Sequence, residues 1–216
     1  MKLQSLVLAA ATALTMTTAF AVPAGTWSVA AGAHYVDPKS DNGTLANGVF
    51  AVDVDGDVRP TISGEYFIAD NVGIELLAAI PFHHDITFTE TNAFGESLKG
   101  KTQHLPPTLS VQYHFDGYNM PMNIKPFVGV GVNYTTFFKE RIDSEIADSL
   151  DLDDSFGVAG HIGVDIPFAE TESFRIDARY IDIKSEATIS EDGVKTKIGE
   201  VDISPWVYGV AFVKQF

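Results

Sequence analysis

Cysteine is absent from the 216-residue sequence, and basic residues are few. Exported proteins commonly rely on disulfides, so an exported chain without cysteine must be held together by another device. The 14 Lys and Arg residues are outnumbered by 29 Asp and Glu residues, which gives a formal net charge of −15. Nucleic-acid binding needs clustered cations that release phosphate counterions, so this composition argues against a nucleic-acid partner.

Long apolar runs are also missing from most of the chain. Beyond residue 21, no segment approaches the ~18 consecutive apolar residues of a membrane-spanning helix. The first residues carry a basic Lys2, an apolar stretch at 6–14 and an Ala-x-Ala pattern at 19–21, which together are typical of a cleaved export signal. We therefore expect residues 1–21 to be a signal peptide and residues 22–216 to form one domain. A membrane-anchoring helix is the alternative, although a threonine-rich stretch interrupts the apolar residues.

Apolar and polar side chains alternate with a period of two in eight segments, as in β-strands. In the last segment, Trp206 and Tyr208 share one face with the terminal Phe216, and only Lys214 interrupts that face. In the third segment, the large apolar face ends at Phe82. The eight segments are residues 25–35, 58–68, 72–82, 105–115, 127–138, 156–166, 174–180 and 206–216.

The face opposite the large apolar residues carries glycines, charges and short polar side chains. A water-soluble barrel has the reverse arrangement, so this pattern indicates lipid outside and a narrow lumen inside. The links at 37–57, 87–102, 139–154 and 185–202 are long and polar, whereas the links between them are shorter. The sequence therefore predicts an all-β fold, an eight-stranded antiparallel transmembrane β-barrel with short periplasmic turns and long extracellular loops. A β-sandwich with facing apolar sheets is the alternative. Aromatic residues near the segment ends would form two interfacial girdles: Trp27, Tyr35, Tyr66, Phe82, Tyr113, Phe115, Tyr134, Phe138 and Trp206.

Five stretches of the sequence resemble the OmpW family of small outer-membrane proteins, and the likeness runs along most of the mature chain. They are DNVGIELLAAIPFHHDI (70–86), HLPPTLSVQYHF (104–115), KPFVGVGVNYTTFF (125–138), DSFGVAGHIGVD (154–165) and DISPWVYGV (202–210). The resemblance implies an eight-stranded barrel in the Gram-negative outer membrane and passive uptake of small hydrophobic molecules.

The resemblance also implies several partners. Phe216 resembles the terminal signal by which the barrel-assembly machinery recognises such proteins. The chain would contact outer-membrane lipid and lipopolysaccharide, and its loops are suited to binding phages or bacteriocins. A loop receptor, an adhesin or a purely structural barrel without transport is therefore the alternative function.

Inward-facing polar residues gather near the short-turn end of the predicted barrel. An eight-stranded barrel is just wide enough for side chains to fill it, and unpaired charges inside it are costly. We therefore expect these residues to form a charged, hydrogen-bonded periplasmic plug, with a proton relay or a catalytic dyad as the alternative. They are Glu65, Glu75, Gln112, Asp165, Arg175 and Asp177.

The lumen becomes more apolar towards the long loops, where we expect Leu77, Ala79, Phe137 and Ile181 to face inwards. At the same level, three prolines occur on consecutive strands, and a proline lacks the N–H that a sheet ladder uses. On the residues alone, bulges or loop ends are the preferred interpretation of these prolines. Together with the resemblance they predict a lateral opening between strands three and four, formed by Pro81, Pro106 and Pro107.

Arg179 departs from the OmpW resemblance, in which an aromatic residue can face the lumen at this position. A charge there would either narrow the solute range to amphipathic molecules or pair with an acid and change little.

Other constellations are weaker. His83, His84, Asp85 and His104 could approach one another, but His83 and His84 point to opposite faces, so we expect no metal site and no cofactor. Ser110 lacks a nucleophile-elbow motif, so we expect no enzyme. The acidic stretch at 53–57 fails the spacing of a calcium loop, which leaves weak divalent binding as an alternative.

Overall fold

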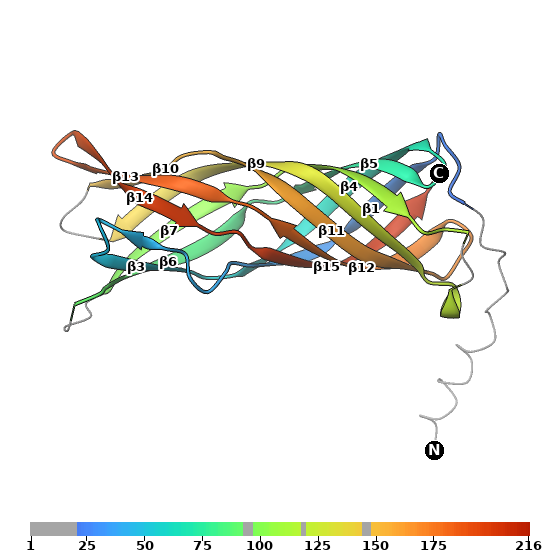
Figure 1. Cartoon of the computed structure of the whole chain (residues 1–216), viewed down its shortest axis with the longest axis horizontal. Coiled ribbons are helices and arrows are strands. Elements are labelled where there is room, and N and C mark those ends of the chain that lie inside the picture. Colours follow the sequence, from blue (N-terminus) through green and yellow to red (C-terminus); the bar gives the residue numbers. More distant parts are fainter. Residues whose placement is uncertain (1–20, 93–96, 118–119, 144–147) are drawn as a thin grey trace, which may run out of the picture.

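The computed structural model describes residues 21–92, 97–117, 120–143 and 148–216. All but one residue of the predicted signal peptide therefore lies outside the described part. The described chain forms a closed antiparallel barrel of eight strands, which confirms the predicted fold (Figure 1). Two wall strands are interrupted, so each consists of two labelled segments. The wall consists of β1 (Trp27–Asp37), β4 (Asp57–Ala69), β5 (Val72–Ala79) with β6 (Phe82–Glu90), β7 (Ser97–Leu105) with β8 (Thr108–His114), β9 (Lys125–Asp143), β11 (Ser155–Pro167), β12 (Glu172–Ile181) and β15 (Trp206–Gln215).

The barrel closes where its first and last strands pair. Trp27 and Phe216 exchange two backbone hydrogen bonds, 2.9 and 3.3 Å long, and the β1–β15 ladder continues to the pair Asp37 and Trp206. A closed sheet has no unpaired edge strand, which suits a medium without water. This closure is the device that holds together a chain without cysteine.

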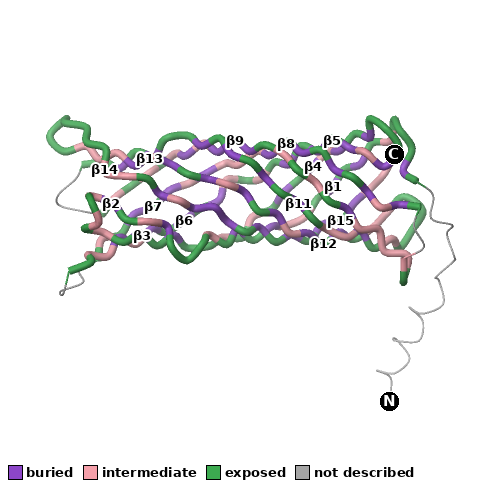
Figure 2. Tube along the Cα trace, viewed as in Figure 1, coloured by how far each residue is buried: buried purple, intermediate pink, exposed green. Residues whose placement is uncertain are grey.

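Buried and exposed residues alternate along the wall strands, as the tube coloured by burial shows (Figure 2). Successive side chains therefore face the lumen and the outer surface in turn. On β15, Val207, Gly209 and Ala211 are buried, while Trp206 and Tyr208 are exposed. The outward apolar residues of the other strands form a continuous band with aromatic contacts near its borders, such as Trp27 with Tyr66 at 4.8 Å between ring centroids. Among the described residues, no helix is long and apolar enough to cross a membrane.

The described parts of the four long links contain β-strands that the sequence analysis did not predict. Wall strands β6, β7 and β9 run on into the links, and further strands occupy most of the rest (Figure 1). Alternate residues in these links, such as Leu45, Phe88 and Val201, are buried and apolar. The outward neighbours of these residues are polar, so the average composition of the links is polar and does not reveal this second apolar core. The added elements are β2 (Thr44–Leu45), β3 (Phe50–Val54), β10 (Ser149–Leu152), β13 (Lys184–Glu191) and β14 (Val194–Asp202), with a short 3-10 helix, η1 (Pro121–Asn123), at the opposite end.

Phe82 faces the lumen, whereas the alternation predicts it on the outer face and in an interfacial girdle. Ile80 points outwards and is 55% exposed, but Phe82 is only 2% exposed. The change occurs because β5 ends at Ala79 and β6 begins at Phe82, so the alternation is broken at Pro81. Beyond this break the even-numbered residues, including His84 and Ile86, face inwards.

Candidate functional site

Arg175 lies at the centre of a charged cluster inside the short-turn half of the barrel. Its Nε and Nη2 donate to the two carboxylate oxygens of Asp165 at 2.7 and 2.9 Å. Its Nη1 is 3.5 Å from Glu75, its Nη2 is 3.9 Å from Glu65, and its guanidinium lies 4.3 Å from the centroid of the Phe127 ring. A two-pronged pair of this kind fixes the orientation of the guanidinium as well as its charge.

Glu75 joins this arginine to the second one, Arg179. The Nη2 of Arg179 donates to Glu75 Oε2 at 2.8 Å, and Gln112 Nε2 donates to the same oxygen at 2.6 Å. Of the two expectations for Arg179, the structure shows the one in which it pairs with an acid. Arg179 is 1% exposed, so its charge belongs to the polar cluster and not to the apolar region above it.

Three histidines complete the cluster. Asp177 is 3.0 Å from His161 and 3.2 Å from His34, and Glu65 is 2.8 Å from His114. All three histidines lie on the inward parity of their strands, but sequence reasoning assigned neither His34 nor His161 to the plug. The alternation along each strand was the available signal, because it shows which side chains face inwards. It could not show which inward side chains lie at the same height along the barrel axis.

The charged cluster leaves almost no free volume. The cavity that remains among His34, Glu75 and Arg179 holds about 10 Å³, which is at or below the space that one water molecule needs. All six residues of the predicted plug are buried and lie within this network or in contact with it. Pairing among the charges offsets the cost of burying them, and the network closes the short-turn half of the lumen.

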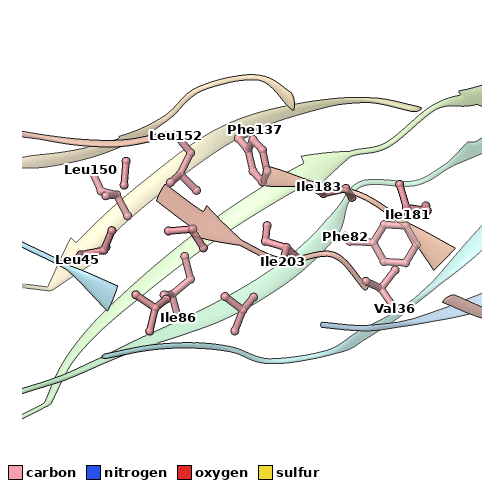
Figure 3. Packing of buried hydrophobic residues seen from close by; sticks show 14 of the residues in the cluster. Val36, Leu45, Phe82, Ile86, Phe137, Leu150, Leu152, Ile181, Ile183 and Ile203 are labelled. Atoms are coloured by element: carbon pink, nitrogen blue, oxygen red, sulfur yellow. The ribbon is translucent and has the colours of Figure 1, made fainter. Parts of the chain in front are cut away.

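The long-loop half of the lumen is filled by apolar side chains (Figure 3). Phe137 and Ile181 belong to this cluster, and Ala79 packs against it. Leu77 is buried too, but it lines the small cavity beside the charged cluster instead. Sequence reasoning missed most of the cluster because many members come from the long links and others from the residues beside them. Members from the links include Leu45, Val52, Phe88, Leu150, Leu152 and Val201, and members beside the links include Val36, Phe82, Ile86, Ile183 and Ile203.

The three predicted prolines lie where the ladder between the third and fourth wall strands is interrupted. Below the interruption, β5 and β8 pair up to Leu77 and Thr108. Above it, β6 and β7 pair from Phe82 and His104 onwards. No ladder pair joins residues 78–81 to residues 105–107, all of which the structure describes. The cause is that Pro81, Pro106 and Pro107 offer no backbone donor.

Asn133 on β9 bridges the fourth-strand side of this interruption. Its side-chain amide donates to the carbonyl oxygens of Pro106 and Pro107, both at 3.1 Å, and lies 3.0 Å from the hydroxyl of Thr108. Thr135 donates to the amide oxygen of Asn133 at 2.6 Å and so orients it. The sequence analysis gave Asn133 no role.

The histidines near the interruption do not converge on one point. The rings of His84 and His104 stack inside the barrel with centroids 4.7 Å apart, while His83 faces outwards and contacts Arg59. Within the described ranges, no three His, Asp or Glu side chains are arranged to hold a metal ion. In the acidic stretch at 53–57, Asp57 is engaged by Arg59 at 2.6 Å.

Comparison with known proteins identifies the family. The model of the OmpW family matches residues 20–216. The chain belongs to the OmpW family. It is 34% identical over 210 residues to outer membrane protein W of Vibrio cholerae, and the match covers 94% of each chain. The crystal structure of the outer membrane protein OprG from Pseudomonas aeruginosa is similar, with a TM-score of 0.79 and 33% identity over 91% of this chain and 98% of that one.

A more distant relative is the dibenzothiophene metabolism operon protein PahQ of Pseudomonas aeruginosa. It is 28% identical over 151 residues, which cover 70% of this chain and 68% of PahQ. This OmpW-family barrel resides in the outer membrane, as its relatives' names and its fold indicate, so the predicted localisation is confirmed. The short turns and the charged cluster lie at the periplasmic end, and β2, β3, β10, β13 and β14 lie at the extracellular end.

Proposed function

We propose that this barrel is a passive channel for small hydrophobic molecules, which enter from the extracellular end and leave sideways through the seam between the third and fourth wall strands. We define this seam as residues 78–81 and 105–107. The observation that carries the proposal is the position of the seam, because the interrupted ladder borders the apolar cluster directly above the closed charged cluster.

The route through the barrel axis is closed to an apolar solute. Below the apolar cluster it meets Arg175, Glu75 and their partners, which fill the cross-section. Displacing these charges would leave buried groups without partners, at a cost of several kcal/mol each. Exit through the seam costs less free energy, since no ladder hydrogen bonds have to be broken across it.

The apolar cluster also indicates the class of solute. Leu45, Phe82 and Ile203 present no hydrogen-bonding side-chain atom, so a molecule lying among them must be apolar over most of its surface. A relative belongs by name to an operon for metabolism of dibenzothiophene, an apolar aromatic compound. We extend this class of solute to the present chain.

Uptake of a radiolabelled medium-chain alkane by cells with and without the protein tests the transport step. We expect faster uptake in cells that contain it, and we expect a Pro81→Ala, Pro106→Ala, Pro107→Ala variant to lose most of the gain, because restored donors can close the ladder. Equal uptake in both kinds of cell would contradict transport.

Disulfides that flank the seam test the lateral exit separately. Leu76 and Leu109 are directly opposite below the seam, and His83 and Gln103 are opposite above it. Opposite positions of an antiparallel pair are close enough for a disulfide, and the chain has no cysteine of its own. With all four positions changed to cysteine, we expect uptake to fall on oxidation and to recover on reduction.

A cysteine pair at Ile176 and Val210, which are opposite on β12 and β15, is the matched control. It staples a continuous ladder far from the prolines, so oxidation should leave uptake unchanged. Uptake that persists through the doubly stapled seam would refute lateral release while leaving transport itself intact.

A loop receptor is the second candidate function. The three-stranded sheet β10–β13–β14 extends the barrel at its extracellular end and presents a hairpin to the medium (Figure 1). Such a surface suits a phage, a bacteriocin or an adhesive contact. Resistance to a phage or bacteriocin on shortening residues 190–195, with alkane uptake unchanged, would support this role. We propose no catalytic role, since Ser110 has no hydrogen bond to a histidine in the described part of the chain.

A further inference from the structure

The outer surface above the apolar band carries a basic hollow. It has a volume of about 490 Å³ and lies over β6, β7 and β9. Lys101, Lys139 and Arg141 line it, together with Asp85 and His83. The whole chain has only 14 Lys and Arg residues and a formal net charge of −15. Three cations around one hollow therefore stand out from an otherwise acidic molecule.

A β-bulge in β9 brings two of these cations to the outer face. Lys101 is opposite Arg141, but Gln103 is opposite Phe138, so β9 has one extra residue in this interval. Lys139 lies in the interval with a φ of 56°, a left-handed conformation that is uncommon for lysine. Before the bulge the odd-numbered residues of β9, such as Phe137, face inwards; after it Lys139 and Arg141 are exposed. Bulges re-aim side chains in this way.

The charges of the hollow are not balanced within the protein. Asp85 is 3.1 Å from Lys101, and both side chains are largely exposed. Lys139 and Arg141 form no ion pair with any residue that the structure describes. The hollow therefore has three cations and one carboxylate, which favours an anionic ligand.

The height of the hollow places it in the head-group layer. Ile80 is the last outward apolar residue of its strand, and His83 follows three residues later. Three residues of strand span about 10 Å, which at a strand tilt near 45° is about 7 Å above the hydrocarbon. The polar layer of a membrane has about that thickness on each side. Phosphate groups of the outer leaflet therefore lie at the level of Lys101 and Arg141.

We propose that this basic hollow binds the phosphate groups of lipopolysaccharide, the phosphorylated glycolipid with which the barrel shares the outer leaflet. The Arg141 guanidinium suits two oxygens of one phosphate, and Lys101 and Lys139 add point charges. The acyl chains of the same lipid would lie along the outward apolar band below. The proposal is independent of the transport function, because the side chains of Asp85, Lys101, Lys139 and Arg141 all lie on the outside of the wall.

Binding of the full-length mature chain in detergent micelles to bisphosphorylated lipid A tests the proposal, with EDTA present so that no divalent cation bridges the partners. In a Lys101→Gln, Lys139→Gln, Arg141→Gln variant we expect the Kd to rise at least ten-fold. Asp85→Asn should instead tighten binding several-fold, because it frees Lys101. This single substitution replaces an exposed carboxylate by an amide of the same size, so it still tests the proposal if the triple variant fails to fold.

A Lys184→Gln, Lys195→Gln, Lys197→Gln variant is the matched control. It removes the same number of charges from exposed lysines of β13 and β14 that already pair with Asp182, Asp151 and Glu186. We expect less than a two-fold change from it. Monophosphorylated lipid A should bind the wild-type chain more weakly than the bisphosphorylated form, and high salt should weaken both.

Equal loss in the two triple variants would overturn the proposal, since it would show a general charge effect. Unchanged binding in both the Asp85→Asn and the Lys101, Lys139 and Arg141 variants would also overturn it. If millimolar inorganic phosphate displaced bound lipid A as effectively as unlabelled lipid A does, the hollow would be a site for free anions. That result would contradict the assignment to a lipid.

Discussion

Asn133 holds Pro107 from the neighbouring strand, with its side-chain amide 3.1 Å from the proline carbonyl oxygen. The same amide reaches Pro106, and the ladder on the far side of these prolines is open. A single side chain on β9 therefore fixes one rim of the seam. Because Asn133 is fully buried, no water can take over its bonds at low cost.

Asn133→Leu should loosen this rim. It removes the amide donor from two carbonyl oxygens that each keep one other donor, the Thr108 hydroxyl for Pro106 and the Tyr134 N–H for Pro107. The loss of these bonds should cost about 1 kcal/mol in unfolding free energy. We expect amide exchange at Tyr134, whose N–H bonds to Pro107, to become faster. Ser28→Ala, which changes a buried inward residue near the periplasmic end of β1, remote from the seam, is the control and should leave that exchange rate unchanged. Equal protection in all three proteins would show that the rim does not depend on Asn133.

Glu75→Gln should destabilise the barrel strongly. The carboxylate is the common partner of Arg175 and Arg179, and losing it leaves two buried guanidiniums with a weaker partner. Breaking a buried ion pair from one side typically costs about 3–5 kcal/mol. Urea unfolding in detergent micelles measures the difference. Arg179→Met in the same protein should recover part of the loss, so a double-mutant cycle with purely additive effects would show that the pair is not coupled.

Phe216→Ser should lower assembly in cells without lowering the stability of the folded barrel. The Phe216 side chain is 73% exposed, and the two hydrogen bonds to Trp27 involve only its backbone. We expect several-fold less assembled protein in the outer membrane, whereas refolded barrel should keep its unfolding free energy within about 0.5 kcal/mol. Phe216→Trp keeps an aromatic terminus and should assemble normally. A large stability loss in the serine variant would assign Phe216 a structural role instead of a recognition role.

The extracellular sheet should loosen in acid through Asp202, which lies at the end of β14 outside the membrane. Partial burial opposes ionisation, but hydrogen bonds from Lys39 and Ser204 outweigh it and hold the pKa of Asp202 below its ordinary value. A carboxyl with a lowered pKa in the folded state stabilises it fully above about pH 4, the unfolded value. That contribution is lost as the pH falls through the folded value.

For this partly exposed pair we expect a contribution of at most about 1 kcal/mol. Amide exchange of β13 and β14, corrected for the intrinsic effect of pH, should show a loss of protection below pH 4. Asp202→Asn should reduce protection at pH 7 and remove the dependence. The Asp151→Asn variant is the control, because the Asp151 carboxylate pairs with a lysine of the same sheet. The pH dependence of protection should persist in this variant. If it were lost, the pH dependence would belong to the carboxylates of the whole sheet and not to Asp202.

The sequence by itself determined the eight barrel strands, the outward apolar face and the family. These features are local, because alternation along one strand shows which of its faces meets lipid whatever its partners are. The inward parity of Glu75, Arg175 and Arg179 was readable in the same way. Strand structure was missed only in the long links, where polar outward residues raised the average polarity of segments that also bury Leu45 or Val201.

The tertiary structure alone decided which inward residues meet. Glu75 and Arg179 are 104 positions apart, and their contact depends on the register of every strand between them around the barrel. A shift of one residue in a single ladder would move partners to another level or to the other face. The breaks in alternation at Pro81 and Lys139 were also decided by the tertiary structure. Only the pairing with neighbouring strands shows where an interruption or a bulge occurs. For this reason the seam, the role of Asn133 and the basic hollow emerge only from the folded barrel.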